Sequence, residues 1–186
     1  MKTLVYFLTS LLFFTISQVN AQERYITDEG HVTFFSDAPL EDITASSNKL
    51  RAILDIESGE TIAKIRIRSF DFRIRLMEEH FNENFMESEK YPEATFNGKL
   101  LNVGSLETES STTSKLPFEG IITIHGVTRP IKDTINLTYS NSFMKGELMF
   151  FLEPEDFDIK IPKILTKKIA EEVKVTVKFN MKPHKE

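Results

Sequence analysis

Apolar and polar residues alternate along much of this 186-residue chain, and this alternation constrains the fold more than any other feature. It is clearest over residues 173–182 and 63–68, and residues 131–139 show it with one interruption at Asp133. Successive side chains of a β-strand point to opposite faces, so a period of two predicts strands with one apolar and one polar face. Such strands are typical of antiparallel sheets that are packed on one side and solvated on the other.

One segment departs from this pattern and has the spacing of a short amphipathic helix. Its less polar side consists of Leu76, Met77, His80, Phe81 and Phe85. Glutamates at positions 78, 79 and 83 lie on the other side of the expected helix. The helix is expected to end before Tyr91-Pro92. Residues 164–171, which follow Pro162, fit either a helical turn or a loop.

Turn signals separate the predicted strands. They lie at residues 28–30, 57–59, 102–104 and 119–120, where glycine and small polar residues favour tight turns. Many strands with one or two short helices predict an all-β domain, either a closed barrel or a sandwich of two sheets. Periodicity alone does not decide between these two architectures.

The first 21 residues have the composition of a cleavable secretory signal. Lys2 precedes an apolar run at residues 4–16, and Val19-Asn20-Ala21 offers small or modest side chains to a signal peptidase. We therefore expect a single mature domain at residues 22–186, located in the periplasm or secreted. The alternative, an uncleaved membrane anchor, usually needs about 17–25 apolar residues. No cysteine lies at the cleavage site, which excludes a lipoprotein.

The composition of the predicted mature chain argues against several classes of protein. Without Lys2 it has 22 basic and 28 acidic residues, a net charge of −6, which argues against a nucleic-acid partner. The chain has no cysteine, so its fold cannot depend on disulfide bonds. The full chain has no tryptophan and 16 phenylalanines, of which 13 lie in the predicted mature chain. Phenylalanine has no polar tip, so it suits the wall of a dry cavity and a solid core equally well.

No residue pattern predicts catalysis or metal binding. The histidines lack the spacing of metal ligands; they are His31, His80, His125 and His184. No Gly-x-Ser-x-Gly motif marks a serine hydrolase. His125 stands beside Gly126 at an expected bend in a strand, so a structural hydrogen bond is favoured over catalysis. We expect a protein without enzymatic activity, cofactor or metal.

Three short motifs follow one another along the chain. The first, at residues 80–96, reads HFNENFMESEKYPEATF and places a Tyr-Pro turn before a strand. The second, at residues 123–130, reads TIHGVTRP, and the third, at residues 156–159, reads DFDI. Each motif is weak alone. Together and in this order they resemble the YceI-like family of secreted bacterial barrel proteins.

The resemblance implies an extended, lipocalin-like antiparallel β-barrel of about eight strands with an elongated apolar interior. Members of the family are associated with binding long-chain amphiphiles, notably polyisoprenoids, in the bacterial periplasm. A homodimer is possible by the same analogy. Two adjacent positions depart from the family, because relatives often carry Arg-Asp where this chain has Met77-Glu78. The difference removes an arginine from the expected mouth of the barrel.

A hollow barrel would bind its ligand, a polyisoprenoid, a quinone or a fatty-acid-like lipid, on the inward faces of its strands. The expected wall residues are Ile65, Ile67, Phe96, Val175, Val177 and Phe179, and the expected mouth residues are His80, Phe81 and Phe85. The alternative is a barrel filled by its own phenylalanines, which would be a stress-related structural or interaction protein. An enzyme that acts on a lipid inside the barrel is the least favoured interpretation.

Overall fold

The structure, a computed structural model, describes residues 24–37, 42–106, 112–140, 143–160 and 172–184. Its strands are β1 (Arg24–Ser36), β2 (Ile43–Asp55), β3 (Glu60–Arg66), β4 (Asp71–Phe72), β5 (Glu93–Leu100), β6 (Thr113–Ile124), β7 (Val127–Ser140), β8 (Phe143–Leu152) and β9 (Val173–His184). Its helices are η1 (Ile67–Ser69), α1 (Arg75–His80), η2 (Phe81–Phe85), η3 (Val103–Ser105) and η4 (Pro154–Phe157). The expected signal sequence and the ambiguous segment at 164–171 lie outside the described residues.

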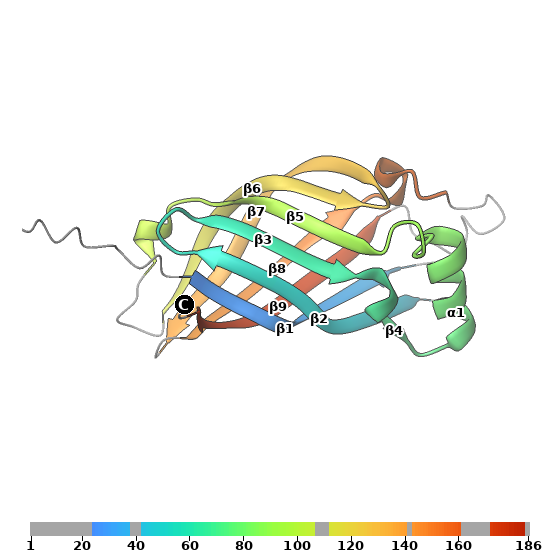
Figure 1. Ribbon diagram of the computed structural model, residues 1–186, viewed down its shortest axis with the longest axis horizontal. Helices are drawn as coiled ribbons and strands as arrows, with labels where there is room; N and C mark the ends of the chain where they lie inside the picture. The colour runs from blue at the N-terminus through green and yellow to red at the C-terminus, as the bar shows by residue number, and fades with distance from the viewer. Residues whose placement is uncertain (1–23, 38–41, 107–111, 141–142, 161–171, 185–186) are drawn as a thin grey trace, which may run out of the picture.

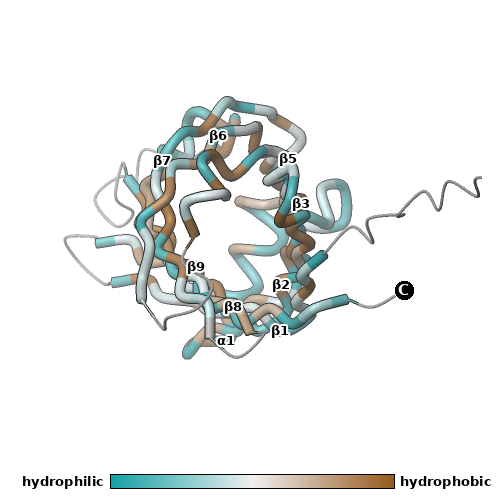
Figure 2. Tube along the Cα trace, turned by 90° about the vertical axis from the view of Figure 1, so that its left-hand side faces the viewer, coloured by the Kyte–Doolittle hydropathy of each residue, from teal (hydrophilic) through white to brown (hydrophobic). Residues whose placement is uncertain are grey.

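Eight of the strands close into one antiparallel barrel (Figure 1). Their order around the barrel is β1-β9-β8-β7-β6-β5-β3-β2, and the pairing of β2 with β1 closes the ring. Figure 2 looks down the long axis and shows this ring of strands end-on. The short strand β4 pairs only with β2. The prediction of an all-β barrel is therefore confirmed, and the sandwich alternative is wrong.

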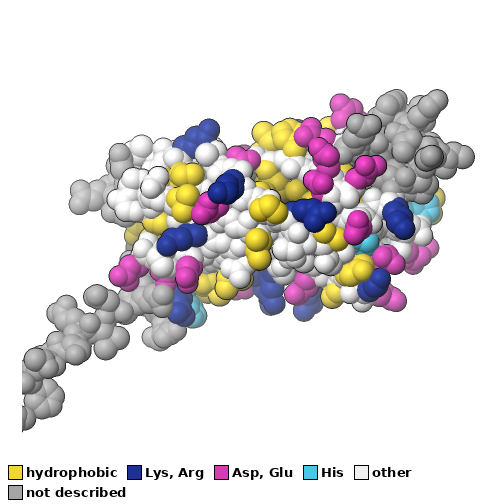
Figure 3. Space-filling view, turned by 90° about the horizontal axis from the view of Figure 1, so that it is seen from above, with side chains coloured by type: hydrophobic (Ala, Val, Ile, Leu, Met, Phe, Trp, Pro, Cys, Tyr) yellow, Lys and Arg dark blue, Asp and Glu magenta, His cyan; other side chains and the backbone are white. Residues whose placement is uncertain are grey.

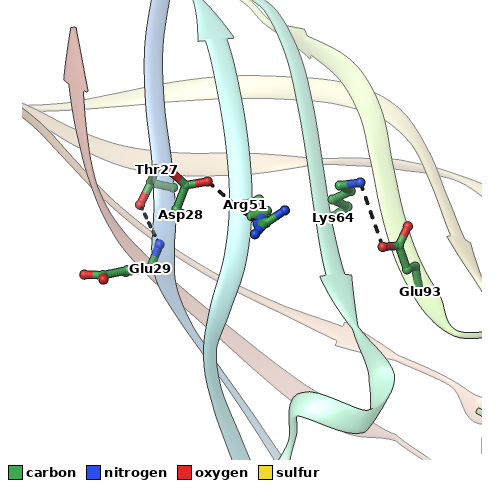
Figure 4. Close-up of polar contacts among 6 residues, drawn as sticks. All are labelled: Thr27, Asp28, Glu29, Arg51, Lys64 and Glu93. Carbon is green, nitrogen blue, oxygen red and sulfur yellow. Dashed lines mark hydrogen bonds and ion pairs between the residues drawn. The ribbon is translucent and has the colours of Figure 1, made fainter. Parts of the chain in front are cut away.

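The predicted alternation of faces is also confirmed. In β3, Ile65 is buried inside the barrel, whereas Lys64 is exposed on the outer wall. Ion pairs join neighbouring strands there: Arg51 Nε lies 3.7 Å from Asp28 Oδ1, and Lys64 Nζ lies 3.8 Å from Glu93 Oε1 (Figure 4). On the face seen in Figure 3, charged side chains of both signs lie among small groups of apolar ones. Exposed ion pairs contribute little to stability, so the apolar interior must hold the barrel together.

The turn predicted at residues 28–30 is wrong, because these residues form a bulge inside β1. Positions 28 and 29 of β1 stand opposite only Arg51 of β2. The backbone N–H of Glu29 donates to Thr27 Oγ1 at 3.4 Å (Figure 4). An extra residue bends a strand without ending it. It also changes which positions face inward: they are odd-numbered up to Thr27 and even-numbered from Gly30 onward.

The turn predicted at residues 119–120 is wrong as well. Gly120 lies within β6, directly opposite Gly98 of β5. A Cβ atom on Gly120 would lie 2.6 Å from the carbonyl oxygen of Asn97, and one on Gly98 would lie 2.7 Å from Gly120 Cα. Any side chain at either position would clash with the backbone of the neighbouring strand. Glycine here marks a close approach of two strands rather than a turn.

Positive backbone φ angles occur in several connections between strands. The turns predicted at residues 57–59 and 102–104 are confirmed, with φ of 78° at Gly59 and 58° at Asn102. The bend predicted inside a strand at His125 is instead a two-residue hairpin between β6 and β7. There φ is 51° at His125 and 76° at Gly126, the combination that a type I′ turn requires.

The predicted short helix is confirmed as α1 followed by η2, and it lies at one end of the barrel (Figure 1). The N–H of Met86 donates to the carbonyl oxygen of Phe81 at 2.8 Å, an i→i+5 bond that characterises the π-helical turn of η2. The helix ends before Tyr91-Pro92, as predicted. In the described part of the chain, no helix is long and apolar enough to cross a membrane.

The opposite end of the barrel is filled by its own side chains. One buried cluster there contains Tyr25, Leu137, Met144 and Met181, each of which exposes 1 % or less of its surface. The hydroxyl groups of Tyr25 and Tyr139 lie 3.2 Å apart and satisfy each other. We call this cluster the filled end. It contrasts with the helical end, where α1 and η2 lie.

Candidate functional site

Between the helical end and the filled end, the barrel encloses a cavity of about 660 Å³. All eight strands of the ring contribute residues to its wall. The volume falls within the range of about 300–1,000 Å³ that small-molecule sites usually have. The inward phenylalanines therefore line a space between the two ends, and the barrel is not filled throughout by side chains.

The wall of the cavity is almost entirely apolar. Its polar residues are Ser36, Thr61, Lys64, His80 and Thr95. Lys64 directs its ammonium group outward to Glu93, and His80 is exposed at the helical end. No aspartate or glutamate is among the described residues of the wall. Burying a charge without a partner in such a space is unfavourable, so the cavity suits an apolar chain whose polar group stays outside.

All nine residues predicted from the sequence lie on the cavity wall. The set comprises Ile65, Ile67, His80, Phe81, Phe85, Phe96, Val175, Val177 and Phe179. Because β3 ends at Arg66, Ile67 reaches the wall from η1 rather than from a strand. The contact of these side chains with a ligand stays a prediction.

The structure adds wall residues that the sequence did not single out. Examples from β1 and β8 are Val32, Phe34, Leu148, Phe150 and Leu152. In β1, the bulge interrupts the alternation that would have revealed them. In β8, the outer face also carries the apolar residues Met149 and Phe151, which are about half exposed. The sequence of β8 therefore lacks the alternation of apolar and polar residues. The inward residues of β8 occupy every second position, at 148, 150 and 152, and this spacing is the local pattern that indicates their common face.

Phe81 is the centre of an aromatic cluster at the helical end. Its ring stacks on Phe34 with centroids 5.3 Å apart, and it meets Phe72 at 5.0 Å and Phe70 at 6.0 Å. Aromatic pairs at these separations attract each other. The cluster joins η2 to β1 and to the η1–β4 segment, so a ligand that enters at this end meets an aromatic rim.

Next to the cavity, His125 links segments that are far apart in the sequence. Its Nδ1 lies 3.0 Å from the carbonyl oxygen of Phe157, and its Nε2 lies 3.0 Å from Glu87 Oε2. The Tyr91 ring meets it edge-on, with centroids 4.5 Å apart. A carbonyl and a carboxylate both accept hydrogen bonds, so each ring nitrogen of His125 faces an acceptor. The predicted structural hydrogen bond of His125 is confirmed.

Phe157 connects this link to the cavity. Its side chain is buried in a cluster with Ile67, Met86 and Ile124, and it forms part of the cavity wall. His125 itself is not among the lining residues. The imidazole therefore lies outside the cavity and holds the wall residue Phe157 in place through its carbonyl group.

Perturbed ionisable groups lie on the outer wall of the barrel. Lys132 Nζ lies 2.8 Å from Glu119 Oε2. This hydrogen bond, and then the attraction of opposite charges, lowers the pKa of Glu119 and raises the pKa of Lys132. Within the described residues, no group of three or more His, Cys, Asp or Glu side chains could hold a metal ion. What the cavity offers is apolar contact.

Comparison with protein families shows where this barrel belongs. The family described as the YceI-like domain matches residues 13–181. The chain belongs to the YceI-like family. The resemblance drawn from the three short motifs is thus confirmed. No curated protein matches the sequence.

Solved structures share the YceI-like fold at low sequence identity. A polyisoprenoid binding domain from Saccharophagus degradans, implicated in plant cell wall breakdown, is 15% identical with a TM-score of 0.75, over 87% of this chain and 98% of that one. BcnA of Burkholderia cenocepacia is 16% identical with a TM-score of 0.67, over 82% of this chain and 95% of its own. A Campylobacter jejuni YCEI protein is 16% identical with a TM-score of 0.53, over 100% of both chains.

The motifs that identify the YceI-like family meet at one place in this barrel. Glu87 comes from the first motif, His125 from the second and Phe157 from the third. Their mutual contacts are structural, whereas the cavity wall is built mainly from the alternating strands. The motifs also supply part of that wall, including Phe81, Phe96, Ile124 and Phe157.

Proposed function

We propose that this protein is an exported binding protein that holds a long-chain apolar molecule inside its barrel, for sequestration or transport. The candidate ligands are a polyisoprenoid, a quinone or a fatty-acid-like lipid. The observation that carries the proposal is the cavity of about 660 Å³ with its almost entirely apolar wall. The description of the Saccharophagus degradans relative as a polyisoprenoid binding domain supports the first of these ligand classes.

The physical chemistry of the cavity suits a long tail. Burying one methylene group contributes about 0.8 kcal/mol, so a chain of many carbons binds tightly without any polar contact. A polar group on the ligand would lie near the exposed His80 at the helical end, where water can solvate it. The expected place of the headgroup is therefore the mouth rather than the interior.

We propose binding without chemistry. His125 is engaged by Phe157 and Glu87 and does not line the cavity, which supports a structural role. His80 lies at the rim without a carboxylate beside it on the described wall. Export rests on the signal-like first 21 residues, and the place of action would be the periplasm or the exterior. A homodimer stays a prediction, which sedimentation of the purified protein can check.

The proposal is tested by native mass spectrometry of the protein purified gently from its own host, followed by organic extraction of any bound molecule. We expect a stoichiometric adduct whose extracted component has a long apolar chain. A ligand-free mass, together with no uptake of added prenyl or acyl lipids, would contradict the proposal.

A blocked cavity should lose its ligand. Val177 lines the cavity, so Val177→Trp places an indole ring inside it and should weaken lipid binding by a factor of about ten or more, because several buried methylene groups lose their space. The matched control is Thr176→Trp, on the neighbouring residue that does not line the cavity, and it should bind as before. Titration with a fluorescent fatty-acid analogue measures both. Equal affinities in the two variants would place the ligand outside the barrel.

A further inference from the structure

The cavity ends where the hollow and filled parts of the barrel meet. Phe96, Phe118 and Phe179 all line the cavity, and all three also belong to or pack against the buried cluster of the filled end. Phe96 and Phe118 meet edge to face, with ring centroids 5.7 Å apart. Leu137 and Met181 of that cluster also line the cavity at this depth, and Met144, which pairs with Met181, is completely buried and does not reach it. We call the rings of Phe96, Phe118 and Phe179, the bulkiest side chains at this depth, the floor.

Two rings of the floor lie against glycines of the wall. Gly146 of β8 stands directly opposite Phe179 of β9, and a Cβ atom on Gly146 would overlap three atoms of the Phe179 ring, the farthest at 2.8 Å. A Cβ atom on Gly120 would lie 2.8 Å from the Phe96 ring. Because glycine has no side chain, each ring can lie close against the neighbouring strand, and a side chain in place of the glycine would push the ring further into the barrel. The glycines thus help to set the depth of the cavity.

We infer that the floor sets the greatest length of apolar chain that the barrel accepts, an inference that rests on the proposed function. A tail entering from the helical end gains about fourfold in affinity for each methylene group that it buries. The gain stops when the end of the tail reaches the floor, because further methylene groups then stay at the mouth in contact with water. If each takes the roughly 30 Å³ of a water molecule in the liquid, the cavity of about 660 Å³ holds about twenty carbons.

Two substitutions should move this limit in opposite directions. Phe179→Ala removes a phenyl ring from the floor, which frees the room of about three methylene groups at 30 Å³ each, so the limit should rise by up to about three carbons, less whatever the surroundings reclaim by relaxing. Gly146→Ala puts a methyl group where the Phe179 ring lies. The three nearest atoms at that position all belong to this one side chain, so the ring can turn into the cavity without a backbone shift. The limit should then fall.

The test compares saturated primary alcohols of about twelve to about twenty-four carbons, by their displacement of a fluorescent fatty alcohol from the purified protein. In the unchanged protein, affinity should rise by about fourfold per carbon and level off near twenty carbons. The levelling point should move up in Phe179→Ala and down in Gly146→Ala. The matched control is Phe151→Ala on the outer wall of β8, where the side chain is half exposed and does not line the cavity. It should leave the levelling point unchanged.

The outcomes separate this inference from the proposed function. If alcohols bind but the levelling point is the same in Phe179→Ala as in the unchanged protein, the floor does not measure length, and the binding function stands. If no alcohol displaces the probe from any of the proteins, both proposals are overturned. Should Gly146→Ala fail to fold, the shift in Phe179→Ala decides the question alone.

Discussion

Replacing Gly98 by alanine is expected to lower the free energy of unfolding by about 3 kcal/mol, the upper part of the range for overpacked interiors. The reason is the direct pairing of Gly98 with Gly120, where an added Cβ atom would lie 2.7 Å from the Cα atom of Gly120. Backbone atoms in a closed ring cannot move aside as a side chain can. Urea denaturation followed by circular dichroism measures the loss.

The matched control for this change is Gly104→Ala. A Cβ atom on Gly104, in η3, would have no other atom within 4 Å. Its effect should stay within about 0.5 kcal/mol, as for other surface substitutions. If the two variants are equally stable, the strands adapt to the methyl group, and the close approach of β5 and β6 is not required by the fold.

Replacing His125 by asparagine is expected to destabilise the protein by about 2 kcal/mol, although it creates an Asn-Gly pair, the preferred sequence for a type I′ turn. The shorter side chain gives up the bonds of both imidazole nitrogens, to the buried carbonyl group of Phe157 and to Glu87. A buried acceptor without a donor costs about 1–3 kcal/mol. Thermal and urea denaturation measure the loss.

Glu87→Gln tests how much the negative charge of Glu87 contributes to its contact with His125. The Glu87 side chain is 48% exposed, so losing its charge should cost less than about 1 kcal/mol. A gain in stability in His125→Asn would show that turn conformation outweighs the link, contrary to our interpretation. A loss as large in Glu87→Gln as in His125→Asn would place the main contribution in the contact with the Glu87 carboxylate instead.

The strands of this barrel are predictable because one side of each strand faces an apolar interior. In β9, the alternation over residues 173–182 persists for almost the whole strand, which lies between β1 and β8 in the barrel. The helix is visible for a similar reason: Phe81 and Phe85 recur at helical spacing because one face of η2 packs on the barrel. Local patterns such as these depend only on neighbours in the sequence.

The bulge and the paired glycines depend on contacts between distant residues, so the sequence alone does not place them. Asp28 and Glu29 before a glycine look like a turn, yet pairing with β2 keeps them inside β1. Glu119-Gly120 looks like another turn, and only the presence of Gly98 opposite explains the glycine. In both cases the tertiary pairing overrides a local turn preference.

The candidate site also has features that local sequence predicts and features that depend on contacts between distant residues. The inward parity of Ile65, Val175 and Val177 places them on the wall, because parity follows from the strand alone. Whether the interior is hollow depends instead on where large rings come to rest. Phe179 is held against Gly146 of the neighbouring strand, and no spacing within β9 indicates that contact.

The first and last strands of the chain, β1 and β9, pair with each other in the ring, and this pairing constrains the order in which the barrel folds. Arg24 at the start of β1 lies opposite both Asp55 of β2 and His184 of β9. Contacts between residues so far apart form late, because the intervening chain must first lose its freedom. Until β9 is available, β1 and β8 each present an open edge to which another chain can add. We expect a chain cut before Val173 to form an open sheet that self-associates, not a smaller barrel. The ring cannot close until β9 pairs with both β1 and β8.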